Sequence, residues 1–304
     1  MPLSTRARAR AALLTATLVW GTSFVVVQRA LVEIPVFHLL AFRFLIATLL
    51  LLPFARPAGG WRAWRTLDRG LLRDGLVIGV VLFAGFALQT AGLLWTTPSR
   101  SAFLTALSVV LVPVIALGLG RPLALGPAAG SVVAAAGLWL LYRPAAGAEA
   151  VPFNRGDALT LIGAVVFAVF VLLVEQAMQR HPVAPLALVQ FAVVSLLSLP
   201  SLILDPPEAR ELTGDALVAV LLTGVLATAA AFYLLLYAQR HLSAVEAGVI
   251  LTLEPVIAAA FSIAMGVEPW TPTLLSGGAL VCLAMVLSEI KRGGPAAGLS
   301  SPPA

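Results

Sequence analysis

The sequence predicts an all-α integral membrane protein with ten transmembrane helices, and three observations support this fold class. The 304 residues are 60% apolar and only 11% charged, with a mean hydropathy of +1.01, which leaves too little polar surface for a soluble fold. The apolar residues form continuous runs close to the roughly 20 residues that cross a bilayer as a helix. These runs do not alternate in polarity, as the roughly 10-residue strands of a membrane barrel would.

Ten segments of the chain have the length and hydropathy of a membrane span. Eight of them contain no Asp, Glu, Lys or Arg, and they cover residues 11–28, 75–99, 101–120, 122–142, 158–174, 182–204, 216–239 and 269–288. The other two are 35–54, which contains Arg43, and 243–265, which contains Glu246 and Glu254. Lipid forces main-chain hydrogen bonds to close within each helix, so we expect a helical bundle with short loops.

Basic residues are unequally divided between the loops at the two ends of the predicted spans. With the N-terminus in the cytoplasm, thirteen Arg and Lys residues fall on the inner side and five on the outer side, and Arg43 remains inside a span. The positive-inside rule therefore predicts two cytoplasmic termini and a multi-pass protein of the cytoplasmic membrane. The same distribution explains the net charge of +5 without a nucleic-acid surface. The expected partners are the lipid bilayer and a small-molecule substrate.

The chain repeats itself at about half its length. A shift of 142 residues aligns 101–116 with 243–258, and both segments carry a proline at the same position. A shift of 147 residues aligns 35–44 with 182–191. The repeated unit holds five spans, and because five is odd, the second copy must enter the membrane from the opposite face. The sequence thus predicts two inverted five-helix repeats related by a pseudo-twofold axis in the membrane plane.

Domain bounds follow from this repeat. They are a basic cytoplasmic N-terminus (1–10), a first repeat (11–142), a linker rich in Pro, Gly and Ala (143–157), a second repeat (158–288) and a disordered cytoplasmic tail (289–304). Inverted repeats are typical of secondary transporters, whose central cavity opens to each side in turn, the cycle called alternating access. A duplication that only enlarged the bundle is the alternative.

Four short motifs resemble the EamA family of the drug/metabolite transporter (DMT) superfamily. They are WGTSF (20–24), AFRF (41–44), LEPV (253–256) and GVE (266–268). The resemblance covers residues 11–288 and implies a ten-helix carrier, often an exporter of amino acids or related small metabolites. The segment GLGR (118–121) departs from the family pattern, which often has an acidic residue there.

Charged side chains inside the predicted spans are candidate site residues, because a charge at bilayer depth is costly. At about 1.5 Å per residue, Arg43 and Glu254 are expected near the midplane, about 12 and 16 Å from the ends of their spans. They have opposite signs and lie in opposite halves, so they either pair with each other or bind the two ends of a zwitterionic substrate. Glu246 and Glu254 are two turns apart and are expected to share one helix face, where a cavity face is expected; the alternative for Glu246, which is nearer the cytoplasmic water, is a purely interfacial position. Pro255 permits a kink beside Glu254.

Glu254 is also the candidate for proton coupling, since burial in a low dielectric disfavours a charged carboxyl group. Trp20 and Ser23 share one face of the first span, and the mid-depth Trp20 needs a partner for its indole N–H. The remaining substrate-binding candidates are the uncharged polar side chains Gln89, Gln190 and Tyr233. Packing between helices is the alternative role for Trp20, and hydrogen bonding between helices is the alternative for the two glutamines.

The function predicted from these features is secondary transport of small organic metabolites, and the family resemblance implies export of amino acids or related compounds. A channel-like facilitator and a non-transporting receptor are the alternatives, although a channel is expected to show a ring of charges or a filter loop. The spans contain no nucleophile with a base, no metal-binding cluster and no Walker motif. We therefore expect no enzyme activity, no catalytic residue, no metal and no cofactor.

Overall fold

The computed structural model describes residues 4–55, 68–120, 125–143, 152–204 and 214–290, and within these ranges all regular structure is helical. In chain order the helices are α1 (Thr5–Ala30), α2 (Val36–Leu51), α3 (Arg69–Gly92), α4 (Pro98–Ala106), α5 (Ser108–Gly118), α6 (Leu125–Tyr142), α7 (Arg155–Met178), α8 (Val183–Ser198), α9 (Ser201–Leu204), α10 (Gly214–Leu222), the π-helix η3 (Thr223–Ala230), α11 (Ala231–Gln239), α12 (Ala244–Leu251), α13 (Leu253–Ala264) and α14 (Pro272–Ile290).

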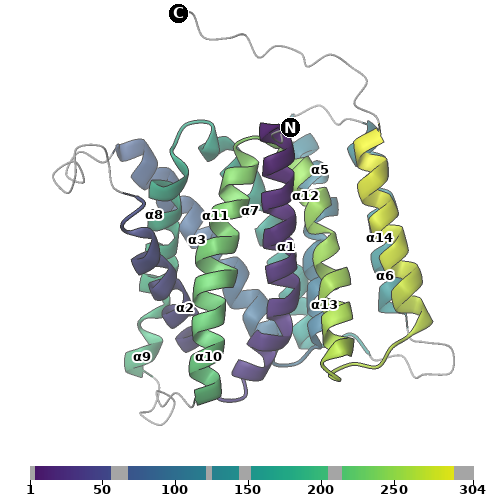
Figure 1. Cartoon of the computed structure of the whole chain (residues 1–304), viewed down its shortest axis with the longest axis horizontal. Coiled ribbons are helices and arrows are strands. Elements are labelled where there is room, and N and C mark those ends of the chain that lie inside the picture. The colour runs from purple at the N-terminus through teal and green to yellow at the C-terminus, as the bar shows by residue number, and fades with distance from the viewer. Residues whose placement is uncertain (1–3, 56–67, 121–124, 144–151, 205–213, 291–304) are drawn as a thin grey trace, which may run out of the picture.

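The helices stand side by side as a bundle, and α1 begins at the end of the bundle where α14 finishes (Figure 1). Among the described residues, seven helical stretches are long and apolar enough to cross a membrane: α1, α3, α4–α5, α7, α8–α9, α10–α11 and α12–α13. The apolar helix α2 is shorter, at 16 residues. The helical fold class is confirmed, and helix occupies part of each of the ten predicted segments. That all ten cross the membrane stays a prediction.

Several helices begin earlier than the charge-free runs suggest, and α1 and α7 show the reason. α1 starts directly after Ser4, whose hydroxyl oxygen accepts a main-chain N–H at 3.2 Å. α7 starts inside the predicted linker 143–157, because Asn154 and Asp157 form a reciprocal capping box. A helix begins at its cap, whereas a charge-free run marks only the part that suits hydrocarbon. The domain bounds stay a prediction, and 291–304 of the predicted tail lie outside the described residues.

Three of the long helical stretches are interrupted near their middle. One divides into α4 and α5 at Leu107, and another divides into α12 and α13 at Thr252. α12 ends at Leu251. The carbonyl of Leu251 would normally accept a hydrogen bond from the N–H four residues later, but that residue is Pro255, which has no N–H. The third stretch passes from α10 into η3 and then into α11. Such π-helical turns are rare in proteins and often lie at functional sites.

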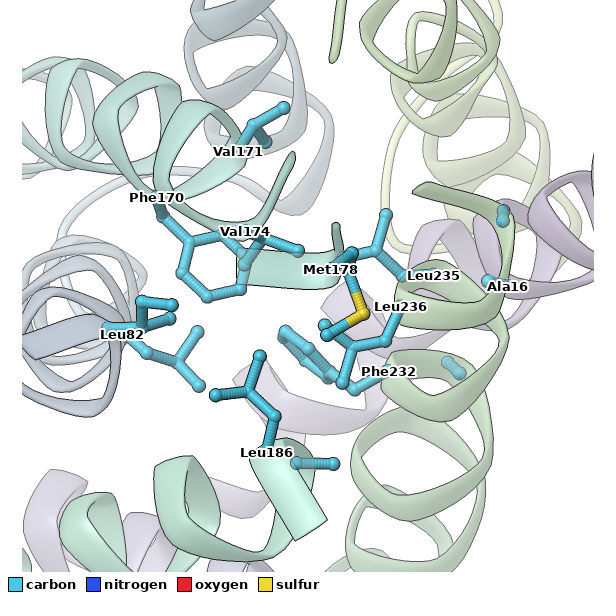
Figure 2. Close-up of a cluster of buried hydrophobic side chains, with 14 of the residues drawn as sticks. Ala16, Leu82, Phe170, Val171, Val174, Met178, Leu186, Phe232, Leu235 and Leu236 are labelled. Atoms are coloured by element: carbon cyan, nitrogen blue, oxygen red, sulfur yellow. The ribbon is translucent and has the colours of Figure 1, made fainter. Parts of the chain in front are cut away.

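Apolar side chains fill the centre of the bundle and also cover its outer surface. Figure 2 shows Leu82, Phe170, Leu186 and Phe232 converging from α3, α7, α8 and α11. On the outside, many large apolar side chains are exposed, for example Leu18 at 55%. An exposed apolar surface of this kind suits contact with lipid and explains the high mean hydropathy.

Glycine allows α1 and α13 to touch through their backbones. A Cβ atom placed on Gly21 would lie 2.7 Å from Ile257 and 2.8 Å from the carbonyl oxygen of Glu254. Real Cβ contacts are not that short, so only glycine fits at this position without a shift of α1 or α13. Gly21 thus fixes α1 against the first turn of α13.

Two of the polar clusters involve both α1 and α7, and the first is the Glu246 cluster, formed by Arg6, Arg10, Glu175, Ala244 and Glu246. The Arg6 and Arg10 guanidinium groups of α1 lie 2.9 and 3.3 Å from a Glu246 carboxylate oxygen of α12. The side chain of Glu246 is only 6% exposed, whereas those of Arg6 and Arg10 are 52% and 38% exposed. The Ala244 N–H of α12 donates to the Glu175 carboxylate of α7 at 2.8 Å.

The second is the Asp157 cluster, formed by Gln28, Thr96, Arg100 and Asp157. Arg100 of α4 lies 2.6 Å from the Asp157 carboxylate of α7, and their side chains are 15% and 0% exposed. Thr96, just before α4, donates to Asp157 at 2.7 Å and accepts the Gln28 amide N–H of α1 on its carbonyl at 2.9 Å. At about 1.5 Å per residue the two clusters lie about 27 Å apart along α1 and along α7.

Candidate functional site

A cavity of about 90 Å³ lies inside the bundle, with walls contributed by α1, α2, α3, α4, α5, α7, α11, α12 and α13. Five of the predicted site residues line it: Trp20, Ser23, Arg43, Gln89 and Glu254. These residues are far apart in the sequence. They come together because α1, α2, α3 and α13 each contribute to the same cavity wall. Most of the remaining wall is apolar.

Arg43 is the cation of the cavity and is 2% exposed. Its Nε–H donates to Thr228 Oγ1 of η3 at 2.9 Å. The guanidinium carbon lies 4.8 Å from the ring centre of Phe86 and 5.5 Å from that of Phe44. These distances allow cation–π attraction, which stabilises a guanidinium group that has left water.

Glu254 is the acid of the cavity and lies in the first turn of α13. The N-terminus of a helix favours negative charge, because its first main-chain N–H groups carry partial positive charge. Among the described residues no ion pair within 4.0 Å joins Glu254 to Arg43, although both side chains line the same cavity. The two opposite charges therefore stand at separate points of the cavity in this conformation.

Trp20 has the hydrogen-bond partner that its indole N–H was expected to need. Its indole N–H donates to the Ala227 carbonyl of η3 at 2.7 Å, and its ring packs edge-on against Phe232 at a centroid distance of 4.8 Å. Ser23 donates to the Trp20 carbonyl one turn earlier, at 2.8 Å. Gln89 donates its amide N–H to the Thr105 hydroxyl of α4 at 2.9 Å, which leaves the amide oxygen as an acceptor on the cavity wall.

Two of the predicted site residues lie outside the cavity wall. Tyr233 follows Phe232, which faces the cavity, and a step of one residue turns a helix by about 100°, so Tyr233 points away and is 38% exposed. Gln190 is fully buried on α8, and α8 contributes no side chain to the cavity. Within the described part of the chain, the Gln190 amide has no hydrogen-bond partner. Direct binding of substrate by Tyr233 and Gln190 stays a prediction, and neither side chain lines the cavity.

The prediction that Glu246 and Glu254 share one cavity face is wrong. Only Glu254 lines the cavity, whereas Glu246 pairs with Arg6 and Arg10 at the end of the bundle. The spacing argument assumed one unbroken helix, but α12 and α13 are separate helices that meet at Thr252.

Some residues of the site have no counterpart in the sequence-based prediction. The aromatic wall consists of Phe86, Phe167, Phe170 and Phe232, which look like ordinary apolar residues of membrane spans. Ala227 and Thr228 of η3 form hydrogen bonds to Trp20 and Arg43, and no π-helix was predicted here from the sequence. Two threonines five residues apart, at 223 and 228, are the one hint, since a π-helix pairs residues at that spacing.

A multi-helix bundle with an apolar exterior and a cavity lined by charged side chains is characteristic of membrane transporters, and comparison with known proteins places the chain in that class. The chain belongs to the EamA-like transporter family, part of the DMT superfamily. The family model matches it twice, over residues 8–143 and again over 154–289. The family resemblance of the four motifs is thus confirmed.

Two individual proteins extend this comparison. The chain is 30% identical over 275 residues to an uncharacterized transporter of Archaeoglobus fulgidus, covering 90% of this chain and 83% of that protein. A protein of known crystal structure superposes with a TM-score of 0.71 at 20% identity, covering 92% of this chain and 96% of the other. At that identity the second comparison supports the fold alone. Together with the family, the first supports a multi-pass membrane transporter.

Proposed function

We propose that the protein is a secondary transporter that exports amphiphilic zwitterions, such as amino acids or related metabolites, across the cytoplasmic membrane by alternating access. The observation that carries this proposal is the pair of opposite charges, Arg43 and Glu254, which line one cavity without pairing with each other. An α-amino acid offers a carboxylate and an ammonium group at a fixed spacing, and this complements a cation and an acid at two points of one cavity.

Each part of such a solute has a chemically suitable partner in the cavity. A guanidinium group binds a carboxylate through two parallel N–H···O bonds, and Arg43 has used only Nε in its bond to Thr228. The Glu254 carboxylate suits the ammonium group. The aromatic wall of Phe86, Phe167 and Phe170 suits an apolar or aromatic side chain, which contributes affinity through buried area.

Alternating access is supported by the duplication of the chain. The family model matches two segments of equal length, and each of them would supply five of the ten predicted spans. An inverted arrangement of two similar halves lets a central cavity open to either side at similar free energy. The ten spans, the inversion and the cytoplasmic termini belong to this proposal.

Counterflow in proteoliposomes loaded with amino acids, nucleobases and cationic drugs tests the proposal. We expect saturable exchange of amino acids by the wild type, and a rise of about 10- to 100-fold in KM for Arg43→Ala and Glu254→Gln, because each variant loses charge-assisted hydrogen bonds to the solute. Arg43→Lys keeps the charge and controls for folding, and Arg240→Gln, at an exposed position, should behave as wild type. Amino-acid exchange at wild-type KM in both cavity variants would refute the proposed site, and rapid flux without saturation would indicate a channel.

Coupling to protons is a separate part of the proposal and rests on Glu254. A carboxyl group that binds either a substrate ammonium group or a proton links the two movements. Glu254→Gln should therefore abolish accumulation driven by a pH gradient, even where passive exchange persists. Uphill transport by Glu254→Gln at the wild-type rate would remove Glu254 from the coupling step.

A further inference from the structure

The hydroxyl group of Thr228 connects the cavity cation to the backbone of η3. Thr228 Oγ1 accepts the Arg43 Nε–H at 2.9 Å and donates its own hydrogen to the Thr223 carbonyl at 2.9 Å. Both threonines are at most 1% exposed, so water does not compete for these bonds. A hydroxyl group has one hydrogen to donate. Once that hydrogen is committed to the carbonyl, the lone pairs of the oxygen are left facing Arg43.

This connection depends on the π-helical geometry. In an α-helix a threonine hydroxyl bonds the carbonyl three or four residues earlier, as Thr223 does with Ala219 at 2.7 Å. Thr228 instead bonds the carbonyl five residues earlier, which the wider turn of η3 makes available. The neighbouring Ala227 carbonyl receives the Trp20 indole N–H. Adjacent residues of η3 thus hold two side chains of the cavity.

The helix that carries Arg43 lies close against the same segment. A Cβ atom on Gly224 would lie 3.2 Å from the Arg43 carbonyl oxygen and 3.1 Å from Ile46. The small residue lets α2 approach η3 closely enough for the short Thr228 side chain to reach Nε. The Phe86 ring also lies against the guanidinium group, so the Thr228 hydroxyl and the ring together limit the rotation of that group.

We propose that Thr228 is a positioning residue, which orients the Arg43 guanidinium group so that its terminal NH₂ groups face a substrate carboxylate. The inference rests on the proposed function of the cavity and deepens it, because it assigns carboxylate selectivity to a hydroxyl group that does not itself contact the solute. Without this bond the guanidinium group rotates about its last side-chain bonds, and its two parallel hydrogen bonds to a carboxylate form less often.

The transport test compares Thr228→Val, which keeps the shape and removes the hydroxyl, with Thr228→Ser, which retains it. Thr228→Val should raise KM for an amino acid about tenfold, as expected for losing one hydrogen bond to a charged group, while the maximal rate changes little. The KM for the matching amine without a carboxylate should not change. Thr228→Ser should restore the wild-type KM. Thr17→Val is the control, because Thr17 is also fully buried, bonds a main-chain carbonyl at 2.8 Å and lies outside the cavity wall.

A second measurement does not require any transported solute. The ¹⁵N NMR signal of the Arg43 Nε–H, assigned by its loss in Arg43→Lys, should show slow hydrogen exchange in wild type and Thr228→Ser, and at least tenfold faster exchange in Thr228→Val. Equal exchange rates, or an unchanged preference for carboxylate solutes in Thr228→Val, would overturn the role of Thr228. Absence of counterflow in the wild type would instead contradict the proposed function, and the NMR result would still decide the positioning role.

Discussion

The Glu246 cluster and the Asp157 cluster fasten the same two long helices, α1 and α7, to the start of an interrupted helix at opposite ends of the bundle. At one end α12 is held by Arg6 and Arg10 of α1, and at the other end α4 is held by Asp157 of α7. The signs are exchanged, since the long helix supplies the cations at the first end and the acid at the second. In each cluster the other long helix adds one hydrogen bond to the main chain near the start of the interrupted helix. Glu175 of α7 accepts the Ala244 N–H of α12, and Gln28 of α1 donates to the Thr96 carbonyl just before α4.

The two clusters differ in how much water reaches them. The arginines of the Glu246 cluster are 38–52% exposed, and water and ions screen such pairs to a worth of about 1 kcal/mol or less. In the Asp157 cluster both partners are nearly buried, so losing one partner strands the other in a low dielectric. The contact of α1 with α12 should therefore separate at lower cost than the contact of α7 with α4.

The largest effect is expected from breaking the buried pair. Asp157→Asn removes the charge that balances Arg100 and should destabilise the protein by about 3–5 kcal/mol, measured by unfolding in detergent. Adding Arg100→Leu should recover part of this loss, because no buried charge then lacks an acid. If Asp157→Asn unfolds at the same temperature as the wild type, the buried Asp157 cluster contributes no more stability than the exposed Glu246 cluster, and the comparison is wrong.

A smaller effect is expected at the other end. Glu246→Gln should cost about 1 kcal/mol or less, because Arg6 and Arg10 remain solvated. Unfolding in the same detergent measures the loss, with Arg240→Gln as the control for removing a charge from the surface. A cost equal to that of Asp157→Asn would contradict the comparison.

The smallest expected effect is the response to salt. Raising the ionic strength from about 0.1 to about 1 M shortens the Debye length from about 10 to about 3 Å. The stability difference between wild type and Glu246→Gln should then disappear, whereas the difference for Asp157→Asn should persist. Parallel salt dependence of both variants would show that the two clusters are equally solvated.

The fold class was predictable from the sequence because hydropathy reports on the environment of whole segments. Arg43, Glu254 and Trp20 emerged as candidates from their distance to the predicted span ends, and all three line the cavity. Direction around a helix was harder to predict. The i, i+4 rule placed Glu246 beside Glu254 on one face, and it failed because the break at Thr252 separates the two carboxylates.

Contacts between distant segments were the other part that sequence reasoning did not reach. Trp20 was known to need a partner, but Ala227 lies more than two hundred residues later and offers only its backbone. Thr228 depends on the width of a π-helical turn, which hydropathy does not report. Phe86 and Phe232 differ from other apolar residues only by facing inward.

The contact at Gly21 has a mechanical consequence. Because Gly21 has no side chain, the α1 backbone lies directly against the Ile257 side chain and the Glu254 carbonyl group of α13. Trp20 adjoins the contact on one side, and Glu254 supplies the carbonyl on the other. A rearrangement that keeps this contact therefore moves α1 and α13 as one piece, so the Trp20 ring and the Glu254 side chain travel together.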